Sequence, residues 1–192
     1  MARITNFQGT VTADVQCNSL NTYNYGADPD GELFVRFLDT NGDGTGLTNA
    51  IGDYSLAAQD FYIQCPENTN LFISKLVIQV EDSGTFDSSS YGNGIELTNG
   101  IKIIFEDADS GELDLTADFP IITNVDYAKY DKNLFLSTFG TGNEYLNFTY
   151  DFFSLGRPIR LLPGEKWIIR LNDDFEALVS HTFNIQGLRR NL

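Results

Sequence analysis

The stretch that decides the fold spans residues 71–109, with LFISKLVIQVED at 71–82 and IKIIFEDAD at 101–109. In both runs apolar side chains recur at every second position, with polar ones between them. This is the period of a strand with one buried and one solvated face. The residues between them, 83–100, are rich in Gly, Ser, Asp and Asn and read as a loop. The stretch therefore predicts strands of a central antiparallel sheet and an elaborate surface loop.

The alternation also predicts which side chains of the two runs face the core. The inward set is expected to be Phe72, Leu76, Ile78 and Val80 in the first run, and Ile101, Ile103 and Phe105 in the second. Ser74 interrupts the apolar face of the first run.

Short segments of the same kind recur along the chain, separated by turn residues. They are expected at 33–38, 60–65, 112–115, 120–127, 133–139, 145–153, 157–162, 166–172 and 180–188. One helical fragment is expected at 173–179, with Asp173 as its cap. About eight to ten short strands with almost no helix predict an all-β fold, an antiparallel two-sheet β-sandwich of jelly-roll-like type. An immunoglobulin-like sandwich ranks second, because its Cys…Trp…Cys spacing is absent.

The chain of 192 residues is long enough for one domain with a single core. Residues 1–32 contain many Asn, Thr, Gly and Asp with little patterning. They are expected to form a flexible N-terminal arm or an irregular edge, and residues 33–192 the β-sandwich domain.

Charge and apolar content exclude several functions. The chain has 27 acidic and 12 basic residues, for a net charge of −15. Such a surface repels phosphate backbones, so no nucleic-acid partner is expected. No apolar run approaches the roughly 20 residues that a membrane helix needs, and the start MARITNFQGT lacks a signal-peptide core. We therefore expect no membrane partner and no export.

A candidate calcium site is formed by Asp39, Asn41 and Asp43, which with Gly44 match the first half of an EF-hand loop. The twelfth position is Ala50, where a bidentate Glu belongs, and the loop follows a strand rather than a helix. Calcium held in another geometry, with help from Asp53, and a simple glycine-rich turn both remain open. No other cofactor is expected.

Catalysis is not expected from the acidic residues or from the one histidine. Acidic clusters occur at Glu81, Asp82 and Asp87, at Glu106, Asp107 and Asp109, and at Asp173 and Asp174. Paired carboxylates can serve a glycosidase, but acidic residues at strand ends more often stabilise turns. His181 alternates with Phe183 and Ile185 and is expected to be structural. Cys65, which closes an apolar strand, is expected to be a buried thiol without a partner.

Aromatic residues lie among small polar residues in three expected loops or arms. They are Tyr23, Tyr25, Phe86, Tyr91, Tyr127 and Tyr130. Such rings suit contacts with a partner protein or stacking on sugars, and they can also fold back over the core. All three interpretations stay open.

Several segments together resemble small structural proteins of tailed bacteriophages. They are KLVIQVED at 75–82, GTFD at 84–87, YGNG at 91–94, LTNGI at 97–101, LT at 115–116, PIITN at 120–124, LNDDFEAL at 171–178 and QG at 186–187. The resemblance covers roughly residues 60–188 and carries no active-site motif. It implies a non-enzymatic virion component with a β-sandwich body.

Within that resemblance, the first expectation is a capsid decoration (cement) protein that binds the major capsid protein or other virion proteins. The acidic surface suits the capsid exterior, after synthesis in the host cytoplasm. A neck or tail ring protein and a carbohydrate-binding β-sandwich module are the alternatives. A homo-oligomer is expected as well, because the edge strands of an open sandwich need cover.

Overall fold

The computed structural model describes residues 31–82, 97–115, 135–139, 143–152 and 158–192. Within these ranges the chain forms ten strands and no helix. They are β1 (Gly31–Phe37), β2 (Gln59–Gln64), β3 (Thr69–Asp82), β4 (Ile101–Glu106), β5 (Glu112–Asp114), β6 (Phe135–Phe139), β7 (Asn143–Asp151), β8 (Ile159–Leu161), β9 (Lys166–Leu171) and β10 (Leu178–Asn191).

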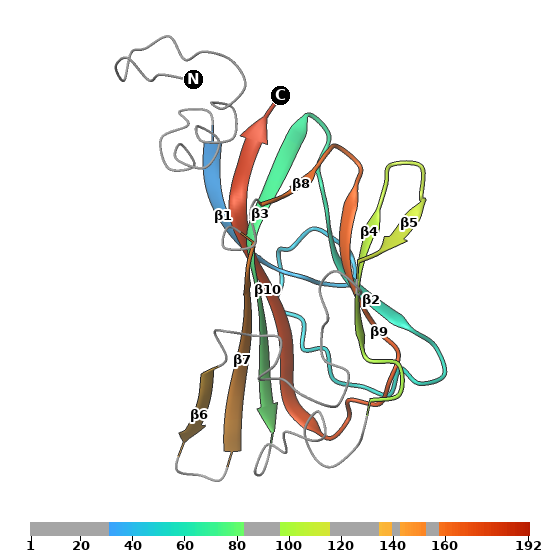
Figure 1. Ribbon diagram of the computed structural model, residues 1–192, viewed down its shortest axis with the longest axis vertical. Helices are drawn as coiled ribbons and strands as arrows, with labels where there is room; N and C mark the ends of the chain where they lie inside the picture. Colours follow the sequence, from blue (N-terminus) through green and yellow to red (C-terminus); the bar gives the residue numbers. More distant parts are fainter. Residues whose placement is uncertain (1–30, 83–96, 116–134, 140–142, 153–157) are drawn as a thin grey trace, which may run out of the picture.

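The strands form two antiparallel sheets that pack against each other (Figure 1). The large sheet has six strands in the order β1-β10-β3-β7-β6, with β8 paired to β3. The small sheet has four strands in the order β2-β9-β4-β5. The predicted all-β two-sheet sandwich is therefore confirmed.

The pairing follows the jelly-roll scheme, in which a long folded hairpin wraps around a common core. The eight strands other than β6 and β8 follow this scheme. The first pairs with the last (β1 with β10), and β2 pairs with β9. The next pairs inward are β3 with β7 and β4 with β5. Neighbouring hairpin pairs alternate between the two sheets, which gives the jelly-roll-like topology expected from the sequence.

The core lies between the sheets and is built from the inward side chains of both. Ile73, Leu76, Ile78, Phe148 and Ile185 come from the large sheet, and Phe61, Ile101, Ile103, Trp167 and Ile169 from the small sheet. Aromatic rings join the two layers, since the ring centroids of Phe61 and Phe183 lie 5.8 Å apart. Burying this apolar surface is the main stabilisation of the sandwich.

One of the residues expected to face inward from β3, Phe72, does not do so in the structure, because β3 contains a β-bulge. Opposite β10, Gln186 pairs with Lys75 but Gly187 pairs with Ile73, so Ser74 is the extra residue. Its hydroxyl donates to Gln186 O at 3.0 Å. The bulge shifts the alternation by one. Ile73 therefore faces the core and is fully buried, whereas Phe72, expected inward, is only partly buried.

The two runs that predicted the fold do not lie in the same sheet. Residues 71–82 belong to β3 of the large sheet, and 101–106 form β4 of the small sheet. The expectation of one central sheet holding both was wrong, because alternation identifies a strand but not its neighbour. The strand expected at 120–127 lies outside the described residues, as does most of the expected arm at 1–32, although β1 already begins at Gly31.

The helical fragment expected at 173–179 was also wrong. Asp174 forms an isolated β-bridge with Asp53, residues 176–177 form a turn, and β10 begins at Leu178. The backbone N–H of Phe175 donates to Gly52 O at 2.9 Å, while its ring is buried in the core. Tertiary packing of Phe175 thus overrides a weak local preference for helix.

Candidate functional site

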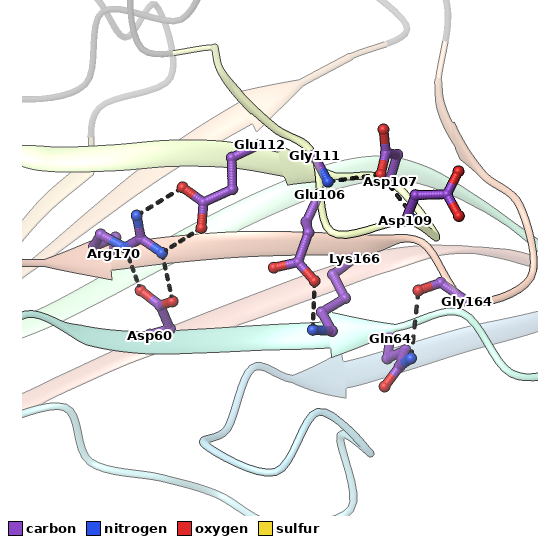
Figure 2. Close-up of polar contacts among 10 residues, drawn as sticks. All are labelled: Asp60, Gln64, Glu106, Asp107, Asp109, Gly111, Glu112, Gly164, Lys166 and Arg170. Atoms are coloured by element: carbon purple, nitrogen blue, oxygen red, sulfur yellow. Dashed lines mark hydrogen bonds and ion pairs between the residues drawn. The ribbon is translucent and has the colours of Figure 1, made fainter.

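The outer face of the small sheet carries a network of ion pairs centred on Arg170 of β9 (Figure 2). Arg170 Nε and Nη2 donate to the two carboxylate oxygens of Asp60 on β2, at 2.6 and 2.8 Å. Its Nη1 and Nη2 also donate to Glu112 of β5, at 3.0 and 2.8 Å. One guanidinium therefore ties together three strands, including both edges of the sheet.

A second pair on the same face joins β9 to β4. Lys166 Nζ lies 2.6 Å from Glu106 Oε1, and it also lies 5.4 Å from the centre of the Tyr62 ring. Ile104 and Ile168, whose side chains point to this same face, are nevertheless buried. Ile104 and Ile168 lie opposite each other, between the pairs Lys102–Arg170 and Glu106–Lys166 of the same two strands. Long charged side chains in such positions can cover apolar surface while their charges stay at the surface.

The hydrogen bonds of this face favour the charged forms of Arg170, Lys166 and Glu112. The pKa of the Arg170 guanidinium is raised by its hydrogen bonds to Asp60 and Glu112, and the bond to Glu106 raises the pKa of Lys166. The pKa of Glu112 is lowered by its hydrogen bond from Arg170. A general acid needs the opposite, a carboxyl whose pKa is raised. The arrangement suits a rigid, charge-paired surface, which we call the charged face: Asp60, Glu106, Glu112, Lys166 and Arg170.

The acidic clusters singled out in the sequence are not brought together, and most of the described members hold turns or ion pairs. Glu106 pairs with Lys166, whereas Asp107 Oδ1 accepts the backbone N–H groups of Asp109 and Gly111 at 2.9 and 2.7 Å (Figure 2). Glu81 Oε1 accepts the Tyr145 hydroxyl at 2.7 Å. Asp87 lies outside the described residues.

Asp173 has a specific structural role that its sequence context did not reveal. Its buried carboxylate accepts the backbone N–H groups of Thr98 and Gly100 at 2.8 Å each, and that of Asn99 at 3.0 Å. These three residues precede β4, and Asp173 follows β9. The side chain therefore fixes the turn that leads into the small sheet.

The three candidate calcium ligands lie together in the loop after β1. Asp39 is buried, and its carboxylate accepts the backbone N–H groups of Asn41, Gly42 and Gly44 at 3.2, 2.5 and 2.9 Å. Asp43 Oδ1 accepts the Thr45 N–H at 2.8 Å, and Asn41 Oδ1 accepts the Asp43 N–H at 3.3 Å. Hydrogen bonds from Thr45 lower the pKa of Asp43. The hydrogen bonds to Asp39, Asn41 and Asp43 therefore explain these residues as stabilising the turn. Calcium binding at this motif stays a prediction.

A hollow of about 600 Å³ adjoins this loop, and the sequence did not point to it. It is lined by residues of β1, β2, β3 and β10 and by the loop after β1. These residues are Phe34, Arg36, Asn41, Gly42, Asp43, Thr45, Ile63, Gln64, Cys65, Pro66, Glu67, Leu71, Gly164 and Arg189. Two basic and two acidic side chains line it, so its charge favours neither cations nor anions. No sequence signal could have found it, because its walls come from five separate segments.

His181 and Cys65 are structural, as expected. His181 is fully buried, with its ring against Phe175 and Phe183 and its Nδ1 3.1 Å from Ala50 O. Burial lowers its pKa from 6.5 to about 3. Cys65 is a buried thiol outside any disulfide; its Sγ donates to Thr69 O at 3.2 Å, and burial raises its pKa.

Partner contact by the aromatic residues singled out in the sequence stays a prediction. Tyr23, Tyr25, Phe86, Tyr91, Tyr127 and Tyr130 all lie outside the described residues. Cys17 lies outside them too.

Comparison with known proteins adds no family to these observations. No family model, no curated protein and no solved structure matches the chain. Within the described ranges, no group of three or more His, Cys, Asp or Glu side chains is placed to hold a metal ion. The same ranges contain no helix that is long and apolar enough to span a membrane.

Proposed function

We propose that this chain is a non-enzymatic structural protein of a tailed-bacteriophage virion, a decoration protein that binds the major capsid lattice from outside. The sequence resemblance to phage structural proteins first suggested this role. The jelly-roll sandwich supports it, since viral capsid domains share that architecture. Fold alone does not assign function, so the argument depends on what the surface can do.

The observation that carries the proposal is the charged face of the small sheet. Arg170 links β2, β9 and β5 through bidentate contacts to Asp60 and Glu112. Lys166 adds a link from β9 to β4 through Glu106. These side-chain contacts between strands, one of which reaches past β4 from β9 to β5, stiffen the sheet beyond its backbone ladder. A protein that braces a pressurised shell needs such a body, whereas a catalytic site would need carboxylates with separated pKa values.

Net charge supports the outer surface of the particle. At −15, the chain would be repelled by the packaged DNA inside a capsid. We propose that it reaches the capsid after synthesis in the host cytoplasm and binds through surfaces away from the paired charges. We propose that segments 6–28, 84–93 and 123–132, which contain the aromatic residues singled out in the sequence, make these contacts; all three lie outside the described residues.

The test is an add-back experiment on particles whose gene for this chain has been deleted. We expect these particles to lose their DNA at a lower temperature than wild-type particles, and the purified chain to restore their stability. A chain that lacks residues 1–28 should bind at least about tenfold more weakly. The matched control is Gly187→Ala, expected not to fold and so not to restore the particles. Particles of unchanged stability that also fail to bind the purified chain would contradict the proposal.

A further inference from the structure

Strand β1 forms one border of the large sheet and has β10 as its only strand neighbour among the described residues (Figure 1). Leu38, one residue past β1, donates its N–H to Phe183 O at 2.9 Å. The β1–β10 register continues to this pair, since Phe37 lies opposite Asn184. In an antiparallel ladder, alternate residues bond the same neighbour. Phe34 and Arg36 therefore bond β10, and the backbone groups of Leu33 and Val35 point away from it.

This outward edge has the features of a pairing surface. Leu33 is 72% exposed and Val35 55%. The strand contains no proline and no bulge against β10. An edge of this kind is a template for another strand. Arg36 partly protects this edge, since its Nη1 donates to the outward carbonyl of Val35 at 2.9 Å.

The sequence of β1 is complementary to itself when read in the opposite direction. The segment Glu32-Leu33-Phe34-Val35-Arg36 has an acid at one end, a base at the other, and Phe34 at its centre. If two copies pair antiparallel around Phe34, each Glu32 lies opposite Arg36 of the second copy. Each Leu33 then lies opposite Val35. Opposite charges and apolar side chains in directly facing positions are the pairs that stabilise a sheet.

We propose that β1 pairs with β1 of a second copy of this chain, and that the two large sheets join into one continuous sheet across a twofold axis at Phe34. Leu33 and Val35 of the two copies face each other as hydrogen-bonded pairs, because both carry outward backbone groups. Arg36 leaves its own Val35 carbonyl for Glu32 of the second copy. Such an isologous interface pairs the β1 edges of both copies at once. It goes beyond the proposed function and does not depend on it.

The test uses charge reversal at the two ends of the strand, with the full chain in solution. Glu32→Arg (E32R) places two arginines opposite each other, and Arg36→Glu (R36E) places two glutamates there. Each single variant should weaken the dimer by about tenfold or more, measured by analytical ultracentrifugation over a concentration series. The double variant E32R/R36E restores the opposite charges and should dimerise like the wild type.

Mixing gives the sharpest result. The E32R and R36E chains should form a mixed dimer with each other, although neither dimerises well alone. Glu176→Arg, a reversal at an exposed residue in the turn before β10, is the matched control and should keep the wild-type molar mass. If a single reversal prevents folding, judged by circular dichroism, Leu33→Lys replaces it and should also weaken the dimer. A wild-type chain that stays monomeric up to about millimolar concentration overturns the proposal. Single variants that dimerise like the wild type, or a mixture that stays monomeric, overturn it equally.

Discussion

Arg170 lies directly opposite Asp60 across the β2–β9 pair, and its Nε and Nη2 atoms donate to both oxygens of that carboxylate. The same guanidinium reaches Glu112 on the far edge strand of the small sheet. One side chain therefore spans the sheet and connects strands that are not neighbours in the ladder. Lys102 provides a comparison on the same face, because its Nζ lies 3.7 Å from Asp114 Oδ2 and both side chains are about half exposed.

Replacing Arg170 by Met should lower the free energy of unfolding by about 1–2 kcal/mol, since it removes charge-assisted hydrogen bonds to two carboxylates. Arg170→Lys keeps the charge but loses the bidentate geometry, and should fall between Met and the wild type. The matched variant Lys102→Met should cost less than about 0.5 kcal/mol, as exposed pairs contribute little. Urea titrations of the three variants make the comparison. Equal losses at Arg170 and Lys102 would mean that the network is an ordinary surface feature.

The adjacent residues Asp173 and Asp174 should respond very differently to the same substitution. Asp173→Asn weakens the acceptor for the backbone N–H groups of Thr98, Asn99 and Gly100, so we expect a loss of about 2–3 kcal/mol. Asp174 accepts only the N–H of Glu176 at 2.9 Å among the described contacts, so Asp174→Asn should cost less than about 1 kcal/mol. Chemical denaturation of both variants checks the order. A larger loss at Asp174 would contradict the assignment of the turn.

Gly187 is required by the bulge between β3 and β10. A Cβ atom at this position would overlap the backbone oxygen of Phe72, a clash that no side-chain movement relieves. Gly187→Ala should therefore prevent folding or cost more than about 3 kcal/mol. Gly46→Ala is the control, because nothing lies within 4 Å of a Cβ atom there. Circular dichroism melts should separate the two, and a native-like melting temperature for Gly187→Ala would show that the bulge is placed wrongly.

The free energy of unfolding should decrease as the pH is lowered below about 6.5, because of His181. Its pKa is 6.5 when solvated and about 3 in the folded chain, where burial disfavours the charged ring. The unfolded chain therefore binds the extra proton between these values. The stabilisation is complete above pH 6.5 and declines by up to about 1.4 kcal/mol per pH unit as the pH falls toward 3.

The control for this slope is His181→Gln, which keeps a donor for the Ala50 carbonyl but does not titrate. Between pH 6.5 and 5 the variant should show a flatter dependence of unfolding free energy on pH than the wild type. Below about pH 5, carboxylates with lowered pKa values, among them Asp43, Asp53 and Glu112, add a slope of the same sign. Wild type and variant with identical slopes above pH 5 would show that His181 is not buried in its neutral form.

The fold class followed from local patterns, whereas the arrangement of the strands did not. Alternation in residues 71–82 and 166–172 predicted β3 and β9, because a half-buried strand must place every second side chain inward. The same pattern said nothing of which sheet each strand joins. It also missed the effect of Ser74, since a bulge is defined by the partner strand rather than by the strand itself.

The charged face could not be predicted for a related reason. Asp60 lies 110 residues before Arg170, and Glu112 lies 58 before it, so no spacing along the chain connects them. The acidic clusters were visible as neighbours in sequence, yet adjacent members have different partners: Glu106 pairs with the distant Lys166, whereas Asp107 bonds the nearby backbone N–H groups of Asp109 and Gly111. Asp173 bonds N–H groups 73–75 residues away, which its adjacency to Asp174 did not suggest. Local spacing predicted the turn around Asp39 because that turn is itself local.

The central claim is that this chain decorates a phage capsid. Electron cryomicroscopy of the phage particles whose genome encodes the chain tests it most directly. The account predicts density for the two-sheet sandwich on the outer surface of the capsid, repeated with the lattice and therefore in hundreds of copies. About a dozen copies or fewer at the neck or tail would place it in the alternative class of virion protein and contradict the decoration role. Absence of the chain from purified particles would contradict a virion function altogether.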